Sequence, residues 1–162
     1  MTRPARVETQ YATRRPWVPA PAWVGRWSHA ALRGAGASGR LCVRVVAPAE
    51  SRRLNRSYRG KDNPTNVLSF PASQAERELA SALGDVVICA AVVAREAREQ
   101  RKTLPAHWAH MVVHGTLHLL GYDHVEPQEA TRMEGLETRI LRGFGYVDPY
   151  RAREAYVQES ER

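Results

Sequence analysis

The segment Thr103–His124, TLPAHWAHMVVHGTLHLLGYDH, carries no aspartate, glutamate, lysine or arginine in its first 20 residues. That length would suit a membrane span, but a proline and four histidines interrupt the run. Pro105 near its start and Gly121 near its end are typical of helix boundaries. Because most side chains between them are apolar, the segment predicts a buried helix over residues 105–121 and no membrane span.

The sequence on both sides of this helix predicts a small β-sheet and further helices. Strands are expected at Val7–Tyr11, Leu41–Ala47, Asn66–Phe70 and Asp85–Cys89. Helices are expected at Pro21–Leu32, from Pro48 onward, at Ala90–Lys102 and at Pro127–Gly143. Residues 71–82 are expected to form a polar connection without regular structure.

The order of these elements predicts the fold class. Two strands in succession, without a helix between them, imply an antiparallel pair, whereas strand–helix–strand units imply parallel ones. We expect an α+β fold: a small mixed sheet of about four strands, covered by helices, with the histidine-bearing helix buried at its centre. A length of 162 residues fits a single compact domain over residues 1–162, in which residues 1–40 are a Pro- and Arg-rich start.

Histidines form a stripe along the central helix. His107, His110, His114 and His118 fall within about 80° of the helix circumference. His114 and His118 stand one turn apart, and Gly121 can reverse the chain so that His124 returns as a third ligand. Three imidazoles on a tetrahedral ion leave one position open for water, which is typical of catalytic zinc. Core histidines with hydrogen-bond partners are the alternative, and we expect that role for His107 and His110.

The spacing His-x-x-x-His-x-x-Gly-x-x-His matches the metzincin proteases with one substitution. Those enzymes carry a glutamate, the general base, directly after the first histidine, where this chain has Gly115. Without that base, peptide hydrolysis is disfavoured, because the attacking water must lose a proton. A metal ion still lowers the pKa of bound water to about 7, which suits attack on a phosphodiester. A zinc peptidase remains the second hypothesis.

Positive charge is concentrated in the first part of the chain. The net charge is +7, yet residues 1–60 alone have 12 arginines against two glutamates, and residues 61–162 balance at −3. Such an excess favours an anionic partner. On the helix that starts at Pro48, Arg52, Arg56 and Arg59 recur on one face, with Lys61 just beyond. Guanidinium groups bind phosphates, so these four residues are candidate substrate ligands.

Other residues narrow the class of protein further. Trp23, Trp27 and Ala31 recur on one face of the expected helix Pro21–Leu32, which favours core packing over base stacking for these tryptophans. Cys42 and Cys89 lie in apolar strand-like runs and are expected to be buried and reduced, without a disulfide partner. The N-terminal residues lack the apolar core of a secretory signal, so we expect a cytoplasmic protein.

Four motifs resemble one known family, the YbeY endoribonucleases, also called rRNA maturation factors. They are HGTLHLLGYDH at residues 114–124, LNRSYRGKDNPTNVLSFP at 54–71, LGDVVIC at 83–89 and MEGLE at 133–137. The resemblance covers about residues 41–150. The chain departs from the family pattern at Asn66, where many members have aspartate.

The resemblance implies one Zn²⁺ per chain, bound by His114, His118 and His124. It implies single-strand-specific endoribonuclease activity in 16S rRNA 3′-end maturation, ribosome biogenesis and ribosome quality control. The partners would be ribosomal RNA and the assembling small subunit with its assembly factors. Arg59 matches a family arginine held to be important for activity, so Arg59 and His114 are the expected catalytic residues. A third hypothesis is a non-catalytic ribosome-assembly factor stabilised by zinc.

Overall fold

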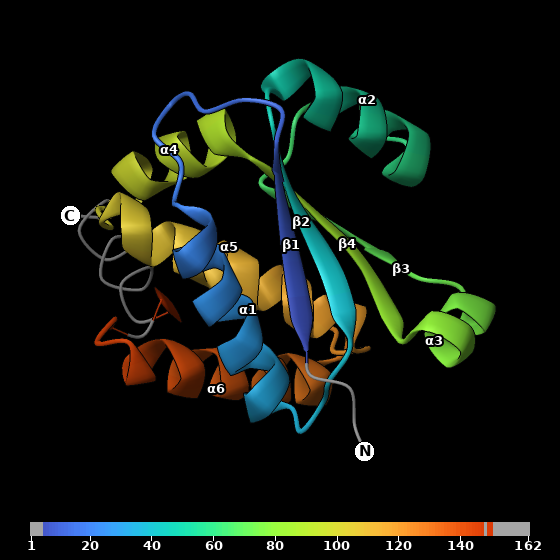
Figure 1. Cartoon of the computed structure of the whole chain (residues 1–162). Coiled ribbons are helices and arrows are strands. Elements are labelled where there is room, and N and C mark those ends of the chain that lie inside the picture. The colour runs from blue at the N-terminus through green and yellow to red at the C-terminus, as the bar shows by residue number, and fades with distance from the viewer. Residues whose placement is uncertain (1–4, 148, 151–162) are drawn as a thin grey trace.

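Four strands form one mixed sheet, which we describe from a computed structural model covering residues 5–147 and 149–150. The strands are β1 (Arg6–Tyr11), β2 (Arg40–Val46), β3 (Val67–Pro71) and β4 (Ala82–Cys89), in the order β1-β2-β4-β3. β1, β2 and β4 run parallel, and β3 pairs antiparallel with β4 (Figure 1). The expected antiparallel pair of successive strands is therefore confirmed.

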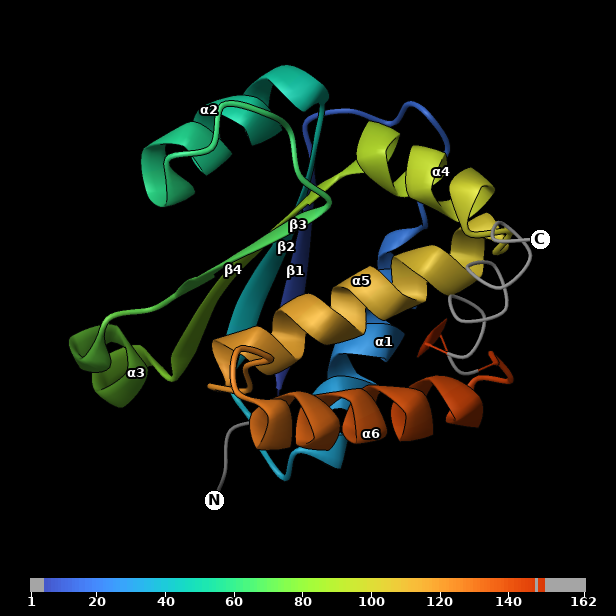
Figure 2. The same cartoon turned by 180° about the vertical axis from the view of Figure 1, so that it is seen from behind.

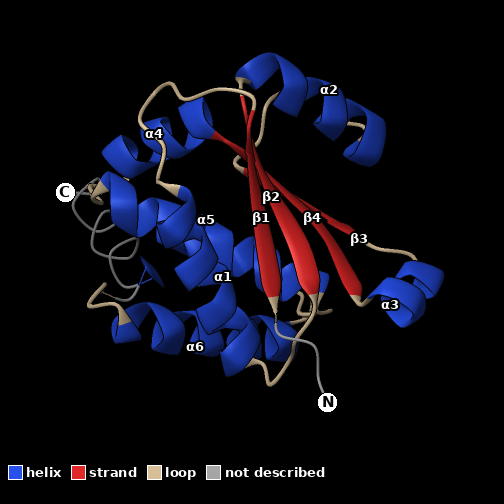
Figure 3. Ribbon diagram, viewed as in Figure 1, coloured by secondary structure: helices blue, strands red, loops and turns tan. Residues whose placement is uncertain are grey.

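The helices cover both faces of this sheet (Figures 2 and 3). They are α1 (Pro21–Gly34), α2 (Pro48–Arg59), α3 (Gln74–Ala80), α4 (Ala90–Glu99), α5 (Leu104–Leu119) and α6 (Pro127–Gly143). The larger core joins α1, α5 and α6 to one face of the sheet, and a smaller apolar cluster lies between the other face and α2. The α+β fold with a mixed sheet is confirmed for the described residues; residues 1–4, 148 and 151–162 of the expected domain lie outside them.

Two expectations about individual segments are wrong. The connection at residues 71–82 contains the short helix α3, which begins with a capping box: the Ser73 hydroxyl accepts from the Glu76 amide, and the Glu76 carboxylate accepts from the Ser73 amide. No α3 residue is buried, so the helix lacks an apolar stripe that would reveal it. Trp23 is 45% exposed, whereas Trp27 is buried as expected. Only one of the two tryptophans reaches the core, because the buried stripe of α1 runs through Val24, Trp27, Ser28, Ala31 and Leu32, and Trp23 lies to one side of it.

Helix α5 lies at the centre of the molecule and approaches the sheet closely at Gly115. Trp108, Val112 and Leu117 on α5 are fully buried. A Cβ atom on Gly115 would lie only 2.5 Å from Cγ1 of Val86 on β4. On β3, the Ser69 hydroxyl donates a hydrogen bond to the Gly115 carbonyl at 2.9 Å. The absence of a side chain at this position therefore allows the histidine-bearing part of α5 to pack directly on the sheet.

The structure also bears on the expected absence of a membrane span and on the state of the two cysteines. Within the described residues, no helix is long and apolar enough to cross a lipid bilayer. Both cysteines are free, as expected. Cys89 is buried, but Cys42 on β2 is only partly buried. The apolar cluster on the α2 side of the sheet includes Val46, at the end of β2, and does not extend to Cys42 near its start.

Candidate metal centre and its pocket

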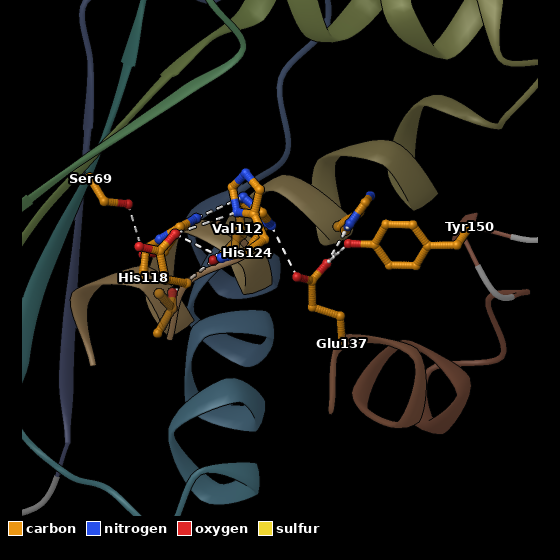
Figure 4. A network of polar contacts seen from close by, with 11 residues as sticks. Ser69, Val112, His118, His124, Glu137 and Tyr150 are labelled. Atoms are coloured by element: carbon orange, nitrogen blue, oxygen red, sulfur yellow. Dashed lines mark hydrogen bonds and ion pairs between the residues drawn. The ribbon is translucent and has the colours of Figure 1, made fainter. Parts of the chain in front are cut away.

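Three histidine side chains converge at the C-terminal end of α5 (Figure 4). Their candidate ligand atoms, on His114, His118 and His124, all lie within 4.8 Å of one another. The Nε2 atoms of His114 and His118 are 3.1 Å apart, and the His124 ring centroid lies 5.5 Å and 5.2 Å from those of His114 and His118. Imidazole nitrogens in this arrangement can bind a single ion.

The turn after α5 returns His124 to the helix. The Tyr122 amide donates to the Leu117 carbonyl at 3.2 Å, and Gly121 has a φ of +95°, a conformation that favours glycine. Beyond the turn, the Asp123 carboxylate accepts a hydrogen bond from the His124 amide at 2.7 Å. The predicted chain reversal at Gly121 thus occurs, and it brings the third imidazole to the other two.

The donor set fits a zinc-type ion. Two nitrogens bound to one tetrahedral zinc lie about 3.3 Å apart, close to the separation of the His114 and His118 Nε2 atoms. Burial lowers the pKa of His118 to about 4, and the neighbouring imidazoles of His114 and His124 act in the same direction. A histidine must be neutral to bind a metal, so His118 is in the ligand form at neutral pH.

A buried carboxylate orients the first of these ligands. Glu137 on α6 is fully buried, and its Oε1 accepts a hydrogen bond from His114 Nδ1 at 3.0 Å. Its Oε2 accepts from His110 Nε2 at 2.6 Å and from the Tyr150 hydroxyl at 2.8 Å. Burial raises the pKa of Glu137, but the hydrogen bonds from His110 and His114 outweigh it and leave the pKa at about 2. An ionised carboxylate holds the proton of His114 on Nδ1, which leaves Nε2 free as a ligand.

The other two histidines of α5, His107 and His110, each contact a carboxylate through Nε2, while their Nδ1 atoms are buried without a hydrogen-bond partner among the described residues. His107 Nε2 lies 3.0 Å from Glu96 Oε1, and the Asn66 side-chain amide donates to both Glu96 oxygens. An amide at position 66 can donate to this carboxylate, whereas an aspartate there would repel it. His110, His114 and Glu137 also lie close enough to share an ion, but their nitrogens already donate to Glu137.

The three histidines open into a pocket of about 460 Å³. Its wall includes the end of α2, β3, the end of α4, the histidine-bearing side of α5 and part of α6. The lining residues are Tyr58, Arg59, Thr65, Asn66, Val67, Ser69, Pro71, Glu96, Gln100, Lys102, His107, His110, Met111, His114, His118, Asp123, His124, Glu134, Pro149 and Tyr150. The pocket extends well beyond the histidines in more than one direction, so it has room for a substrate that reaches past the metal centre.

Only one of the four predicted substrate ligands on and after α2 lies in this pocket. Arg59, the last residue of α2, lines it, but Arg52, Arg56 and Lys61 are not among the lining residues. Arg52 instead donates to both oxygens of Asp62, at 2.8 and 2.9 Å. Helix α2 is held to the segment that leads into β3 by hydrogen bonds that link Asn55 to Asn63 and Ser51 to Thr65. These contacts place Arg59 on the same pocket as the three histidines.

Sequence reasoning missed two residues of the site, Glu137 and Tyr150. Glu137 carried a signal, because it lies on the apolar stripe of α6 with Met133, Leu136 and Ile140. A carboxylate at a core-facing position of a helix requires a buried partner. Tyr150 lies after α6, and nothing in its local sequence indicates that its hydroxyl reaches Glu137.

The position that would carry the protease base does not face the pocket. Gly115 packs against Val67 on β3 and Val86 on β4, so a glutamate there would collide with the sheet. The arrangement therefore presents three imidazoles, an arginine and an open pocket without a glutamate adjacent to His114. The fold and this site define the class of the protein: an α+β protein with a candidate metal centre that opens into a pocket.

Comparison with known proteins identifies the family. The family model described as "Endoribonuclease YbeY" matches residues 22–145. The chain therefore belongs to the YbeY endoribonuclease family, whose members are RNA-cleaving hydrolases. Among solved structures, the chain is similar to the solution structure of TM1509 from Thermotoga maritima, with a TM-score of 0.57 and 24% identity, over 83% of this chain and 86% of that one. This second likeness concerns the fold.

Proposed function

We propose that the protein is a zinc-dependent, single-strand-specific endoribonuclease that matures the 3′ end of small-subunit ribosomal RNA. The observation that carries the proposal is the joint lining of one open pocket by His114, His118, His124 and Arg59. Ribosome quality control and contact with the assembling subunit in the cytoplasm belong to the same proposal. We take the whole chain, residues 1–162, as one nuclease domain.

Each residue of the site has a role in this reaction. His114, His118 and His124 would hold the ion, and Glu137 would keep His114 in the tautomer that binds it. A bound zinc ion would supply a Lewis acid and lower the pKa of a coordinated water. Arg59 would bind a non-bridging phosphate oxygen and stabilise the charge that develops there in the transition state. The adjacent Tyr58 ring, which lies 4.6 Å from that of Phe70, would form a wall for an unpaired base.

The proposal is tested with a precursor fragment of the small-subunit RNA that spans the mature 3′ end. The purified protein is expected to cut this fragment with zinc, to lose activity with a chelator and to regain it when zinc is restored. His114→Ala should be inactive. A folded His114→Ala protein that cuts as fast as the parent would contradict the assignment. Zinc binding without cleavage of any RNA would instead favour an assembly factor.

Arg59 provides a second test with a matched control. Arg59→Gln should lower kcat on the order of 100-fold, because a charge that stabilises the transition state is removed. Arg56→Gln makes the same change one turn earlier on α2, outside the pocket lining, and should leave kcat nearly unchanged. Single-turnover cleavage rates at saturating enzyme separate this effect from RNA affinity. Equal loss in both variants would show that Arg59 acts only through overall charge.

A further inference from the structure

Away from the pocket, the end of β1, the segment that follows it and the start of α1 carry arginines and aromatic rings. We call this the basic–aromatic surface and define it by Tyr11, Arg14, Arg15, Trp17, Trp23 and Arg26. Trp17 is 50% exposed and Trp23 is 45% exposed, whereas Trp27 and Trp108 are buried. The surface lies at the β1 edge of the sheet and the start of α1 (Figure 1). No residue of β1 or α1 lines the pocket, so the surface is separate from the metal centre.

Contacts within the surface hold its side chains in place. The Arg26 guanidinium lies 4.9 Å from the centre of the Trp23 ring, and the Arg14 guanidinium lies 4.5 Å from the centre of the Tyr11 ring. The Tyr11 hydroxyl donates to the Pro19 carbonyl at 2.6 Å, which ties the connecting segment to β1. Ordered rings and guanidinium planes reduce the conformational entropy that a ligand would otherwise have to remove on binding.

The positive charge of this surface is not neutralised within the described part of the chain. Residues 9–49 include six arginines and no aspartate or glutamate. Other arginines of the described chain do have carboxylate partners: Arg44 pairs with Glu50, Arg52 with Asp62 and Arg95 with Glu99. Among the described residues, no carboxylate lies within ion-pair distance of Arg14, Arg15 or Arg26. An ordinary solvated face mixes both signs of charge, so this surface is suited to an anionic partner.

The chemistry of the surface favours single-stranded RNA over a lipid membrane. Unpaired bases stack on aromatic rings and on arginine planes, while guanidinium groups bind the phosphates between them. A helix that lies in a membrane interface needs a broad exposed apolar face. On α1, the apolar residues Val24, Trp27 and Ala31 are buried in the core, and the exposed side presents Trp23 beside Arg26.

We propose that the basic–aromatic surface is a second binding site for single-stranded RNA, which holds the substrate outside the catalytic pocket. This inference rests on the proposed ribonuclease function, because it assigns a further contact to the same RNA. The surface would contribute affinity and not chemistry. Variants of it should therefore raise KM for long RNA, leave kcat unchanged, and have no effect on an oligonucleotide too short to leave the pocket.

Binding is measured with chelator-treated full-length protein, so that cleavage does not interfere. The probe is a fluorescein-labelled 20-nucleotide oligouridine, titrated by fluorescence anisotropy at several salt concentrations. The double variant Trp17→Ala/Trp23→Ala should weaken binding at least about tenfold, because stacking contributes strongly to the binding of each base. Arg14→Glu/Arg26→Glu should also weaken it and should reduce the salt slope by about 0.7 for each phosphate that the variant no longer binds.

The control compares two single charge reversals, Arg26→Glu on the surface and Arg139→Glu at an exposed arginine of α6. Arg139→Glu should weaken binding far less than Arg26→Glu. Unchanged affinity in the tryptophan variant, with its thermal unfolding unaltered, would overturn the proposal. So would a defect confined to vesicles of anionic lipid, which would identify a membrane partner, or a defect in self-association with RNA binding intact.

The outcome is distinguishable from failure of the proposed function. If zinc-loaded protein cuts no RNA while the surface variants still weaken oligouridine binding, the nuclease proposal fails and the RNA site stands. If the parent cuts RNA and the surface variants bind and cut long RNA equally well, only the second site is refuted.

Discussion

At the scale of single residues, the metal centre depends on Glu137 as much as on the three histidines. Its carboxylate accepts from His110, His114 and Tyr150 at once and lies entirely inside the protein. A buried carboxylate in this state must remain hydrogen-bonded to stay ionised. The residues around it therefore influence the metal site without touching an ion.

Tyr150→Phe tests that influence, because it removes only the hydroxyl that donates to Glu137. Loss of a hydrogen bond behind a metal ligand typically weakens metal affinity by about 10- to 100-fold, and we expect a change near the lower limit. Competition with a chromophoric zinc chelator measures it. Tyr146→Phe is the control, since Tyr146 is a partly buried tyrosine that packs on the core. Equal zinc affinity in the parent and Tyr150→Phe would contradict this role.

Acid should destabilise the metal-free protein through the buried His110. Burial lowers the pKa of His110 from 6.5 to about 4, although the hydrogen bond from its ring to Glu137 opposes that shift. The unfolded chain therefore binds a proton at higher pH than the folded chain, and stability falls as the pH drops from 6.5 to 4. For this histidine the loss is on the order of 3 kcal/mol.

The measurement is urea unfolding of chelator-treated protein across that pH range. Glu137, whose folded pKa of about 2 lies below its ordinary 4.5, adds a further loss in the same direction below pH 4.5. His110→Gln retains an amide donor for Glu137 but cannot take up the proton. Its stability should depend less on pH between 6.5 and 4. A parent protein equally stable at both limits would show that His110 does not titrate on unfolding.

At the scale of elements, the packing of α5 on the sheet decides where the histidines lie. Gly115 brings the helix against Val67 and Val86, and His114 and His118 then face the pocket. Gly115→Ala would force the helix away from β4, because a Cβ atom there meets Val86 Cγ1 at 2.5 Å. We expect a loss of about 1 to 3 kcal/mol in the free energy of unfolding and weaker zinc binding.

The matched control for this change is Gly135→Ala on α6. A Cβ atom on Gly135 meets nothing within 4 Å, and the residue lies in a helix interior. Alanine should stabilise that helix by about 0.5 to 1 kcal/mol. Chemical denaturation of both variants gives opposite signs if close packing is the cause. A stabilising Gly115→Ala change would contradict the packing argument.

The arrangement of elements shows which parts of the fold could be predicted from the sequence. β3 and β4 are short, mostly apolar segments of strand length, and α5 is largely apolar between Pro105 and Gly121. The sequence therefore predicted all three elements within a few residues. Helix α3 was missed because none of its residues is buried. The outward position of Trp23 was missed because the spacing of Trp23, Trp27 and Ala31 did not show that the buried stripe of α1 is centred on the side of Val24 and Ser28.

At the scale of the whole molecule, the net charge is +7, and the arginines that contribute to it lie in different surroundings. Arg59 lines the pocket, Arg52 is paired with Asp62, and the arginines near α1 have aromatic rings as neighbours. If Arg52 and Arg56 attract RNA toward the pocket, the double variant Arg52→Glu/Arg56→Glu should lower RNA affinity and the salt dependence of that affinity. Filter binding at several salt concentrations tests this. An unchanged slope would restrict phosphate contacts to Arg59 and other sites.

The local chemistry follows from the sequence alone: a helix with histidines one turn apart, a glycine that reverses the chain, and a third histidine within reach of the other two. These relations depend on helix periodicity and on short separations along the chain. Three features emerge only from tertiary packing: Glu137 and Tyr150 support His114, Arg59 shares its pocket, and Trp23 remains outside the core. Those contacts join residues far apart in the chain, and they are set by which faces of α5, α6 and the sheet pack together.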